Sequence, residues 1–178
     1  MTTIETTSEF VISRTFNAPR AKVWKGWTDA AHLAEWWGPK GFKATVKKLD
    51  LRPGGLFHYF LKSPQGQDMW GRFVYREIIP GERLVFISSF SDENAGLTRH
   101  PRHEGWPLQL LSTITFDERD GKTTVTVRWE PYEASGAERE TFASGHASMQ
   151  GGWTGTLDQL NGHLEHVSRA YSPIRHRH

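Results

Sequence analysis

The chain has 178 residues, a length usual for one domain, and 37% of them are hydrophobic, which is enough to form a core. It contains no cysteine, which excludes disulfides, thiolate metal sites and cysteine catalysis. The formal net charge of +2 is too small for the basic stripe of a nucleic-acid-binding protein. No apolar run approaches the roughly 20 residues of a membrane helix, and the first residues do not resemble a signal peptide. We therefore expect a cytoplasmic protein with no membrane span and no nucleic-acid partner.

The first elements in chain order are a strand and two short helices. Residues 10–16 are rich in β-branched and aromatic side chains and are predicted to form a strand. Asn17 or Ala18 is expected to cap the first helix, with Pro19 in its first turn. Thr28-Asp29 is expected to cap the second helix, which carries Leu33, Trp36 and Trp37.

From about residue 42 the hydrophobic period changes to two, which indicates a run of strands separated by turns. The expected strands are 44–51, 56–61, 69–79, 84–90, 108–116 and 123–130. The dipeptide Asp120-Gly121 is expected to join the last two strands as a hairpin. Residues 91–107 hold several Gly, Pro and Asn residues, which favours a long loop.

The last predicted element is a long helix that follows the capping box of Ser135 and Glu138. Beyond this box an apolar stripe extends over about 30 residues at spacings of three or four. Its members are Phe142, His146, Met149, Trp153, Leu157, Leu160, Leu164 and Val167. The leucines indicate core packing. Gly145, Gly151 and Gly152 interrupt the other half, each at a cost of about 0.8–1 kcal/mol relative to alanine. They indicate a close backbone approach, room for a ligand or a bend.

Several short motifs accompany this order of elements. They are Arg14–Pro19 with Val23-Trp24, Trp36–Pro39, Asp50–Gly55, Glu77-Ile78, Glu82–Phe86, Thr113–Phe116, and Gly152-Trp153 with Leu157 and Leu160. Together the motifs and the order of elements resemble the START-like (SRPBCC) superfamily. They are most similar to the branch of the Aha-type activator of a heat-shock-protein ATPase and the calicheamicin-resistance protein. The match runs from about residue 10 to about residue 167.

The resemblance implies an α+β helix-grip fold in a single domain over residues 8–169, with flexible termini at 1–7 and 170–178. A curved antiparallel sheet of six to seven strands is expected to wrap around the long C-terminal helix, with two short helices after the first strand. A hydrophobic cavity is implied between this helix and the sheet. The residues expected to face it are Trp36, Trp37, Phe57, Tyr59, Trp70, Phe73, Tyr75, Phe86, Phe142, His146, Met149, Gln150 and Trp153.

Catalytic and metal sites are less well supported by the residue pattern. His146 on the helical stripe and Glu77 on its strand are candidates for general acid–base work, and each has an ordinary alternative. A histidine on an apolar helix face is usually a hydrogen-bonded core residue, and Glu77 can turn outward at a bulge or pair with Arg83. The nine histidines show no third ligand at the spacing of a zinc site. We therefore expect no metal and no cofactor.

The expected function is binding of a hydrophobic small molecule that is aromatic, lipid-like or polyketide-like. The high aromatic content favours a pocket over a solid core, because ligand sites are apolar and aromatic with a few polar anchors. One alternative is an enzyme of the cyclase or hydrolase kind that uses the same pocket. A second is a co-chaperone-like interaction module with a chaperone partner. A homodimer stays open, as does the identity of the ligand.

Overall fold

The computed structural model describes residues 9–175, and side chains only as far as Val167. Within these residues a single sheet of seven antiparallel strands is accompanied by four helices. The α+β class, the sheet and the long C-terminal helix are therefore confirmed. The expected flexible segment 1–7 lies outside the described residues, and so do residues 176–178.

The strands follow one another across the sheet, except that the first strand pairs with the last. They are β1 (Phe10–Phe16), β2 (Lys43–Leu49), β3 (Leu56–Lys62), β4 (Asp68–Ile79), β5 (Arg83–Phe90), β6 (Leu110–Arg119) and β7 (Lys122–Pro131). Their order is β1-β7-β6-β5-β4-β3-β2. The predicted hairpin at Asp120-Gly121 is confirmed, since Arg119 pairs with Lys122 and both turn residues have positive φ, as a tight two-residue hairpin requires.

Two short helices connect β1 to β2, as predicted. Helix α1 spans Arg20–Thr28 and helix α2 spans Ala30–Trp36. The carboxylate of Asp29 caps α2 by accepting the backbone N–H of His32 at 3.2 Å, which confirms that cap. The cap predicted for α1 is wrong, because Pro19 itself takes the cap position with extended backbone and no side-chain hydrogen bond.

The C-terminal segment forms two helices instead of the single predicted one. Both hydrogen bonds of the Ser135–Glu138 capping box are present, but they begin the short helix α3 (Gly136–Ser144). The chain turns at Gly145 and then enters the 30-residue helix α4 (His146–Arg175). Of the three explanations offered for the glycines, a bend therefore holds at Gly145.

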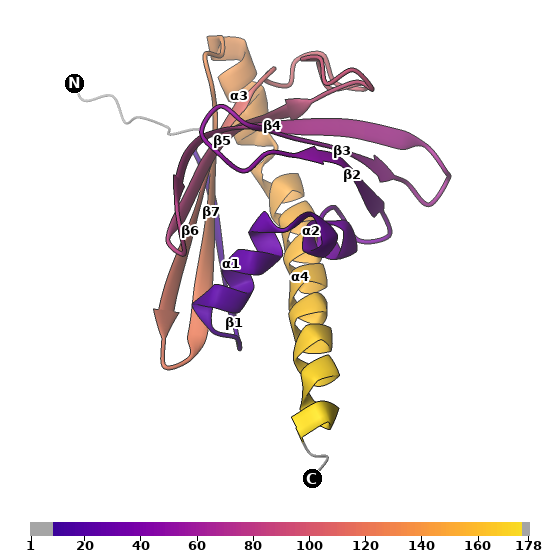
Figure 1. Cartoon of the computed structure of the whole chain (residues 1–178). Coiled ribbons are helices and arrows are strands. Elements are labelled where there is room, and N and C mark those ends of the chain that lie inside the picture. Colours follow the sequence, from indigo (N-terminus) through magenta and orange to yellow (C-terminus); the bar gives the residue numbers. More distant parts are fainter. Residues whose placement is uncertain (1–8, 176–178) are drawn as a thin grey trace, which may run out of the picture.

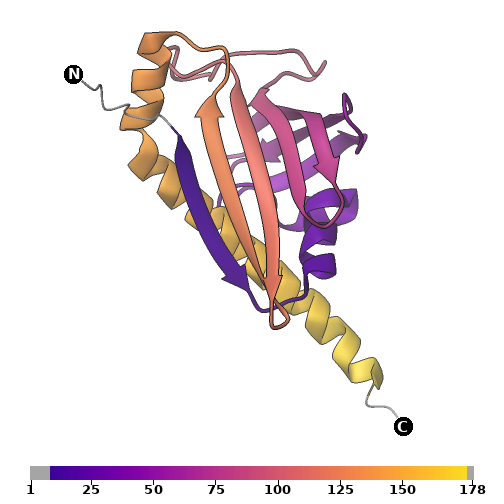
Figure 2. The same cartoon turned by 90° about the vertical axis from the view of Figure 1, so that its left-hand side faces the viewer.

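Figures 1 and 2 show how these parts are layered. The sheet curves around α4, which crosses its concave side from end to end. Helices α1 and α2 lie on the same side and contact the C-terminal part of α4. The core follows this arrangement, since inward-facing side chains of β1 and β3–β7 are buried together with Trp27, Leu33 and the leucines of α4.

Candidate functional site

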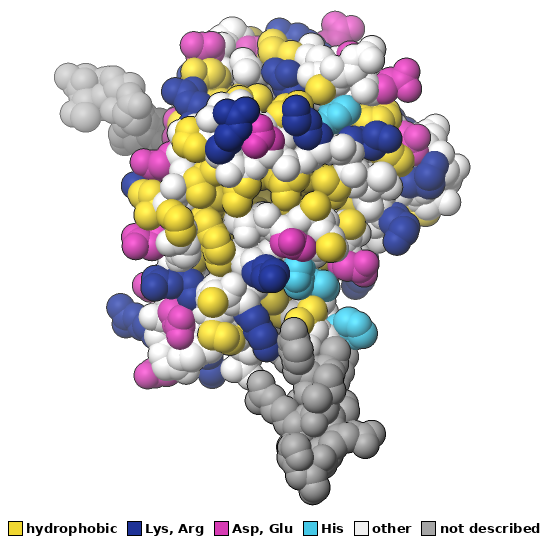
Figure 3. Space-filling view, in the orientation of Figure 1, with side chains coloured by type: hydrophobic (Ala, Val, Ile, Leu, Met, Phe, Trp, Pro, Cys, Tyr) yellow, Lys and Arg dark blue, Asp and Glu magenta, His cyan; other side chains and the backbone are white. Residues whose placement is uncertain are grey.

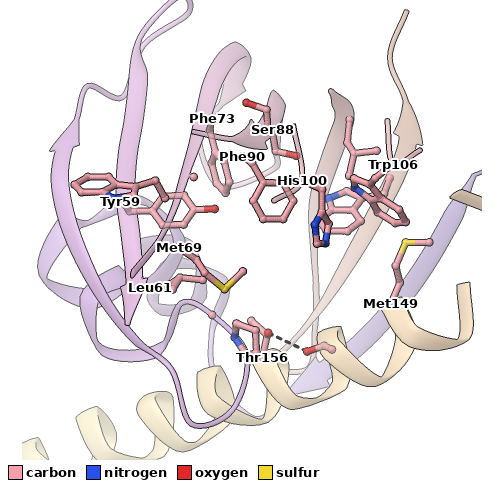
Figure 4. Close-up of a pocket in the computed structure, with 18 of the residues that line it drawn as sticks. Tyr59, Leu61, Met69, Phe73, Ser88, Phe90, His100, Trp106, Met149 and Thr156 are labelled. Atoms are coloured by element: carbon pink, nitrogen blue, oxygen red, sulfur yellow. Dashed lines mark hydrogen bonds between the residues drawn. The ribbon is translucent and has the colours of Figure 1, made fainter. Parts of the chain in front are cut away.

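A cavity of about 290 Å³ lies between the N-terminal half of α4 and the sheet. Strands β3, β4 and β5 form one wall, and α4 contributes Met149, Gly152, Trp153 and Thr156. The loop between β5 and β6 closes another side with His100, Trp106, Pro107 and Leu108. Figure 4 shows side chains from the strands, the loop and the helix converging on this space.

Small residues on three elements border the cavity. Gly71 of β4 and Ser88 of β5 are buried, Gly152 of α4 is exposed, and all three line it. A Cβ atom at Gly152 would meet no other atom within 4 Å. Further along β5 the same inward face carries Phe86, whose ring stacks on Phe73 at 3.9 Å and leaves no such space. Side-chain size along single elements therefore decides where the core is solid and where it is open.

The wall is apolar, and its polar groups are neutral. None of the described residues that line the cavity is Asp, Glu, Lys or Arg. The hydroxyl of Ser88 is hydrogen-bonded to that of Ser112 at 3.2 Å, and Thr156 Oγ1 donates to the carbonyl oxygen of Gly152 at 3.0 Å. Burial raises the pKa of the Tyr59 hydroxyl to about 12, an effect that the neighbouring Trp37 side chain partly offsets. The site therefore suits an uncharged molecule.

The loop that closes the cavity (residues 91–109) is attached at several points. Asp92 Oδ1 accepts the backbone N–H groups of Gly96 and Asn94 at 2.8 and 2.9 Å, which hold the pKa of this carboxyl below its usual range. Arg99 Nη1 contacts Glu138 of α3 at 2.6 Å, and Glu138 also completes the capping box. The carboxylate of Glu138 thus connects the loop, through Arg99, to the start of α3, through Ser135.

The predicted ligand-contacting residues divide into two groups. Those that line the cavity are Trp37, Tyr59, Trp70, Phe73, Met149 and Trp153. Those that do not are Trp36, Phe57, Tyr75, Phe86, Phe142, His146 and Gln150. Phe57, Tyr75 and Phe86 are buried in the aromatic layer around Phe73. Trp36, at the end of α2, is buried against α1 and donates its indole N–H to the carbonyl oxygen of Gly26 at 2.8 Å.

The remaining residues of the second group lie toward the α3–α4 turn or on the surface. Phe142 is fully buried against Trp106, and the ring of His146 packs between Phe142 and Phe10. Gln150 is exposed on the opposite face of α4. The two catalytic candidates therefore do not meet in the cavity. Glu77 follows the bulge after Tyr75 and pairs with Arg83 at 3.0 Å, which is the ordinary alternative stated for it.

The histidines form pairs instead of metal clusters. Within the described part of the chain, no group of three or more potential ligands is placed to hold a metal ion. The ring of His163 lies against His32 of α2, with Nδ1 of His32 2.7 Å from Nε2 of His163. Burial lowers the pKa of His163, and the nearby His32 lowers it further.

The family is decided by a match that covers most of the chain. Residues 17–165 match the model of the family described as Activator of Hsp90 ATPase homolog 1-like protein. The chain belongs to this family. A search of curated proteins found no match. No helix in the described residues is long and apolar enough to cross a membrane.

Solved structures with the fold of this activator-like family come from several bacteria. A protein of Arthrobacter aurescens has a TM-score of 0.76 and 23% identity, over 93% of this chain and 90% of that one. A protein of Mycobacterium smegmatis has a TM-score of 0.69 and 27% identity, over 88% and 90%. A protein from the dynemicin biosynthetic locus has a TM-score of 0.63 and 20% identity, over 89% of this chain and 47% of its own. These likenesses support the same fold.

Several lining residues of this family member were not predicted from the sequence. Ser88 and Phe90 continue the inward face of β5 that begins with Leu84 and Phe86, so their alternation was a usable signal. His100 and Trp106 lie in a loop without any periodicity. Their concentration of aromatic and imidazole side chains in a short loop was the signal available for them.

Proposed function

We propose that this protein binds a hydrophobic small molecule in the cavity between α4 and the sheet. The observation that supports this proposal is a cavity of about 290 Å³ whose described lining residues are aromatic, aliphatic or neutral polar. Ligand sites are typically apolar clefts of roughly 300–1,000 Å³ with a few polar groups, so this one suits a compact ligand. Transfer of an apolar molecule into it would contribute about 25 cal/mol per Å² of buried surface before ordering costs.

The cost of leaving such a space in a core also favours a ligand. A cavity in a protein interior is unfavourable by about 24 cal/mol per Å³ in large-to-small core variants. A larger side chain at Ser88, which is buried, would reduce this cost. The small residue at this position is therefore expected to serve binding more than folding.

Tryptophan fluorescence offers a direct test, because five of the eight tryptophans line the cavity. These are Trp37, Trp70, Trp106, Trp129 and Trp153. Fatty acids, flavonoids and an apolar dye should be titrated into the protein, with compounds related to dynemicin added because of the structural neighbour from that locus. At least one class should quench or shift the emission saturably. Native mass spectrometry of freshly purified protein should detect a co-purified molecule.

Absence of saturable binding for every class, together with no co-purified molecule, would refute this function. Activation of an Hsp90-type ATPase, the activity in the family's description, would then become the leading candidate function. Its test is the rate of ATP hydrolysis by an Hsp90-type chaperone with and without this chain.

A further inference from the structure

Two polar groups enter the cavity from opposite walls. Figure 4 shows the hydroxyl of Tyr59 reaching in from β3 and the ring of His100 reaching in from the loop. Both residues line the cavity, and Phe90 and Phe73 lie between them along the sheet wall. Since they face the same space, one ligand can contact both.

The position of Tyr59 is fixed by a glycine on the neighbouring strand. Tyr59 pairs with Gly71 in the sheet, and a Cβ atom at Gly71 would collide with the Tyr59 phenol. Only glycine there lets the ring cross β4 at this angle. With a pKa of about 12 the hydroxyl keeps its proton at physiological pH, and none of the described residues accepts that proton in a hydrogen bond. It is available as a donor.

His100 is also a donor toward the cavity, for a different reason. Its Nδ1 lies 3.0 Å from the backbone N–H of Arg102 and accepts that hydrogen bond. A neutral ring that accepts at Nδ1 carries its proton at Nε2. Burial lowers the pKa of His100, and the nearby His103 and Arg102 lower it further, so the neutral form dominates at pH 7. In the described part of the chain no acceptor is bonded to Nε2.

The other polar groups of the cavity wall are also mainly hydrogen-bond donors. The tryptophan side chains that line the cavity have an N–H group that can only donate. The hydroxyls of Ser88 and Thr156 are already engaged within the protein, so apart from Tyr59 the remaining lining hydroxyl of the described residues is that of Ser89. No carboxylate of the described residues lines the cavity. The wall therefore offers donors, few acceptors and no charge.

We infer that the ligand is a neutral apolar molecule with a carbonyl-type oxygen, such as a ketone, quinone or ester, which accepts hydrogen bonds from Tyr59 and His100. This inference rests on the proposed function and adds the chemical class of the ligand. Without an acceptor, a bound ligand would leave two donors desolvated and unpaired, which is unfavourable. A carboxylate ligand would find no cation in the described wall.

The test uses two probes that differ only in the acceptor, 2-acetylnaphthalene and 2-ethylnaphthalene, with affinities measured by isothermal titration calorimetry. The wild-type protein should bind the ketone about 3- to 10-fold more tightly, the range expected for one neutral hydrogen bond. Tyr59→Phe should reduce this preference toward onefold, because the ketone loses a hydrogen bond and the hydrocarbon no longer leaves that hydroxyl unpaired. His100→Leu should reduce it as well.

Tyr75→Phe is the matched control, because Tyr75 is a buried tyrosine that does not line the cavity. It should keep the full preference for the ketone. Equal affinity of the wild-type protein for both probes would overturn the inference and leave the proposed function intact. A preference that survives in the Tyr59→Phe, His100→Leu double variant would overturn it too. If neither probe binds, the inference fails, and the wider ligand titration with native mass spectrometry decides the proposed function separately.

Discussion

The two parts of α4, before and after Thr156, have different surroundings. In the C-terminal part Leu157, Leu160 and Leu164 are buried, and α1 and α2 pack against this part of the helix. The packing is close enough that a Cβ atom at Gly26 of α1 would lie 3.5 Å from Leu160. This half of the helix is part of a solid core.

The N-terminal half faces strands and the loop between β5 and β6, and its Trp153 ring also stacks on Trp27 of α1 with centroids 6.3 Å apart. Met149 and Trp153 are buried here, yet both border the cavity, and Gly152 lies between them without a side chain. One amphipathic helix thus serves two purposes along its length. Where α1 and α2 cover the concave side of the sheet, leucines fill the interior, and where they do not, the chain keeps a space.

The largest expected difference between the halves is in stability. Leu160→Ala should lower the free energy of unfolding by about 4 kcal/mol, because its surroundings cannot collapse into the space. Met149→Ala should cost about 2 kcal/mol, the low end for such changes, because Met149 already borders a cavity. Urea denaturation of both variants measures the difference. Equal losses would mean that the two halves are packed alike.

A second comparison uses adjacent glycines on α4. Gly152→Leu should place a side chain in the cavity, raise stability by about 1 kcal/mol through helix propensity, and lower ligand affinity at least about 10-fold. Gly151→Leu is the matched control, since both glycines are exposed but only Gly152 lines the cavity, and it should gain similar stability with unchanged affinity. In the sequence, room for a ligand was one of the explanations that applied equally to both glycines. Loss of binding in Gly151→Leu with none in Gly152→Leu would reverse the assignment.

The loop that closes the open half should respond weakly to loss of its ion pair. Arg99→Ala removes the contact with Glu138 and should cost less than about 1 kcal/mol, as exposed ion pairs do. Amide hydrogen exchange of residues 97–107 should become faster, since Arg99 also donates to the Trp106 carbonyl at 3.3 Å. Arg119→Ala, whose exposed pair with Asp117 spans 3.9 Å, should leave that exchange unchanged. Unaltered exchange in Arg99→Ala would show that other contacts hold the loop.

The smallest expected effect is on the pH dependence of stability. It involves His163 on the C-terminal part of α4 and His100 on the loop that closes the cavity. Burial lowers the pKa of His163 and of His100 below the usual value of 6.5. Around His163, the charges of His32 and His166 lower the pKa further and that of Glu35 opposes them. The unfolded chain therefore takes up protons first, so stability is complete above about pH 6.5 and declines as the pH falls below that value.

Urea midpoints at pH 7.5 and pH 5.5 measure this decline. His163→Gln should make the difference between the two midpoints smaller, because the variant has no imidazole to protonate at that site. Between pH 7.5 and pH 8.5 wild type and variant should show the same slope, which serves as the internal control. An unchanged difference between pH 7.5 and pH 5.5 in the variant would contradict the role of His163.

Periodicity predicted most of the fold, and its one clear failure has a physical reason. The strand over residues 10–16 and the Asp29 cap depend on local patterns that tertiary contacts do not alter. The break at Gly145 was missed because Phe142, His146 and Met149 keep helical spacing across it. Residue spacing reports which face is apolar, and it does not report a change in the direction of the helix axis.

The site was harder to predict than the fold. Alternation along β3 and β4 placed Tyr59 and Phe73 on the inward face, but it placed Phe57 and Tyr75 there equally. Tyr59 and Phe73 line the cavity, whereas Phe57 and Tyr75 do not. The difference lies in the groups that face each pair across the sheet, and these depend on the positions of α1, α2 and the loop. His100 lines the cavity because of the path of its loop, and residue spacing in the sequence does not predict such a position.

The pairing of β1 with β7 has a consequence for how the chain acquires its structure. Phe10 pairs with Trp129 and Phe16 with Thr123, so the partner strand of β1 lies more than a hundred residues further along the chain. Contacts this distant in sequence slow folding, because a long loop must close before they form. During synthesis on the ribosome, the apolar side chains of β1 remain without their sheet until β7 has emerged. Deletion of residues 1–16 is therefore expected to speed refolding of the remaining strands while lowering the stability that they reach.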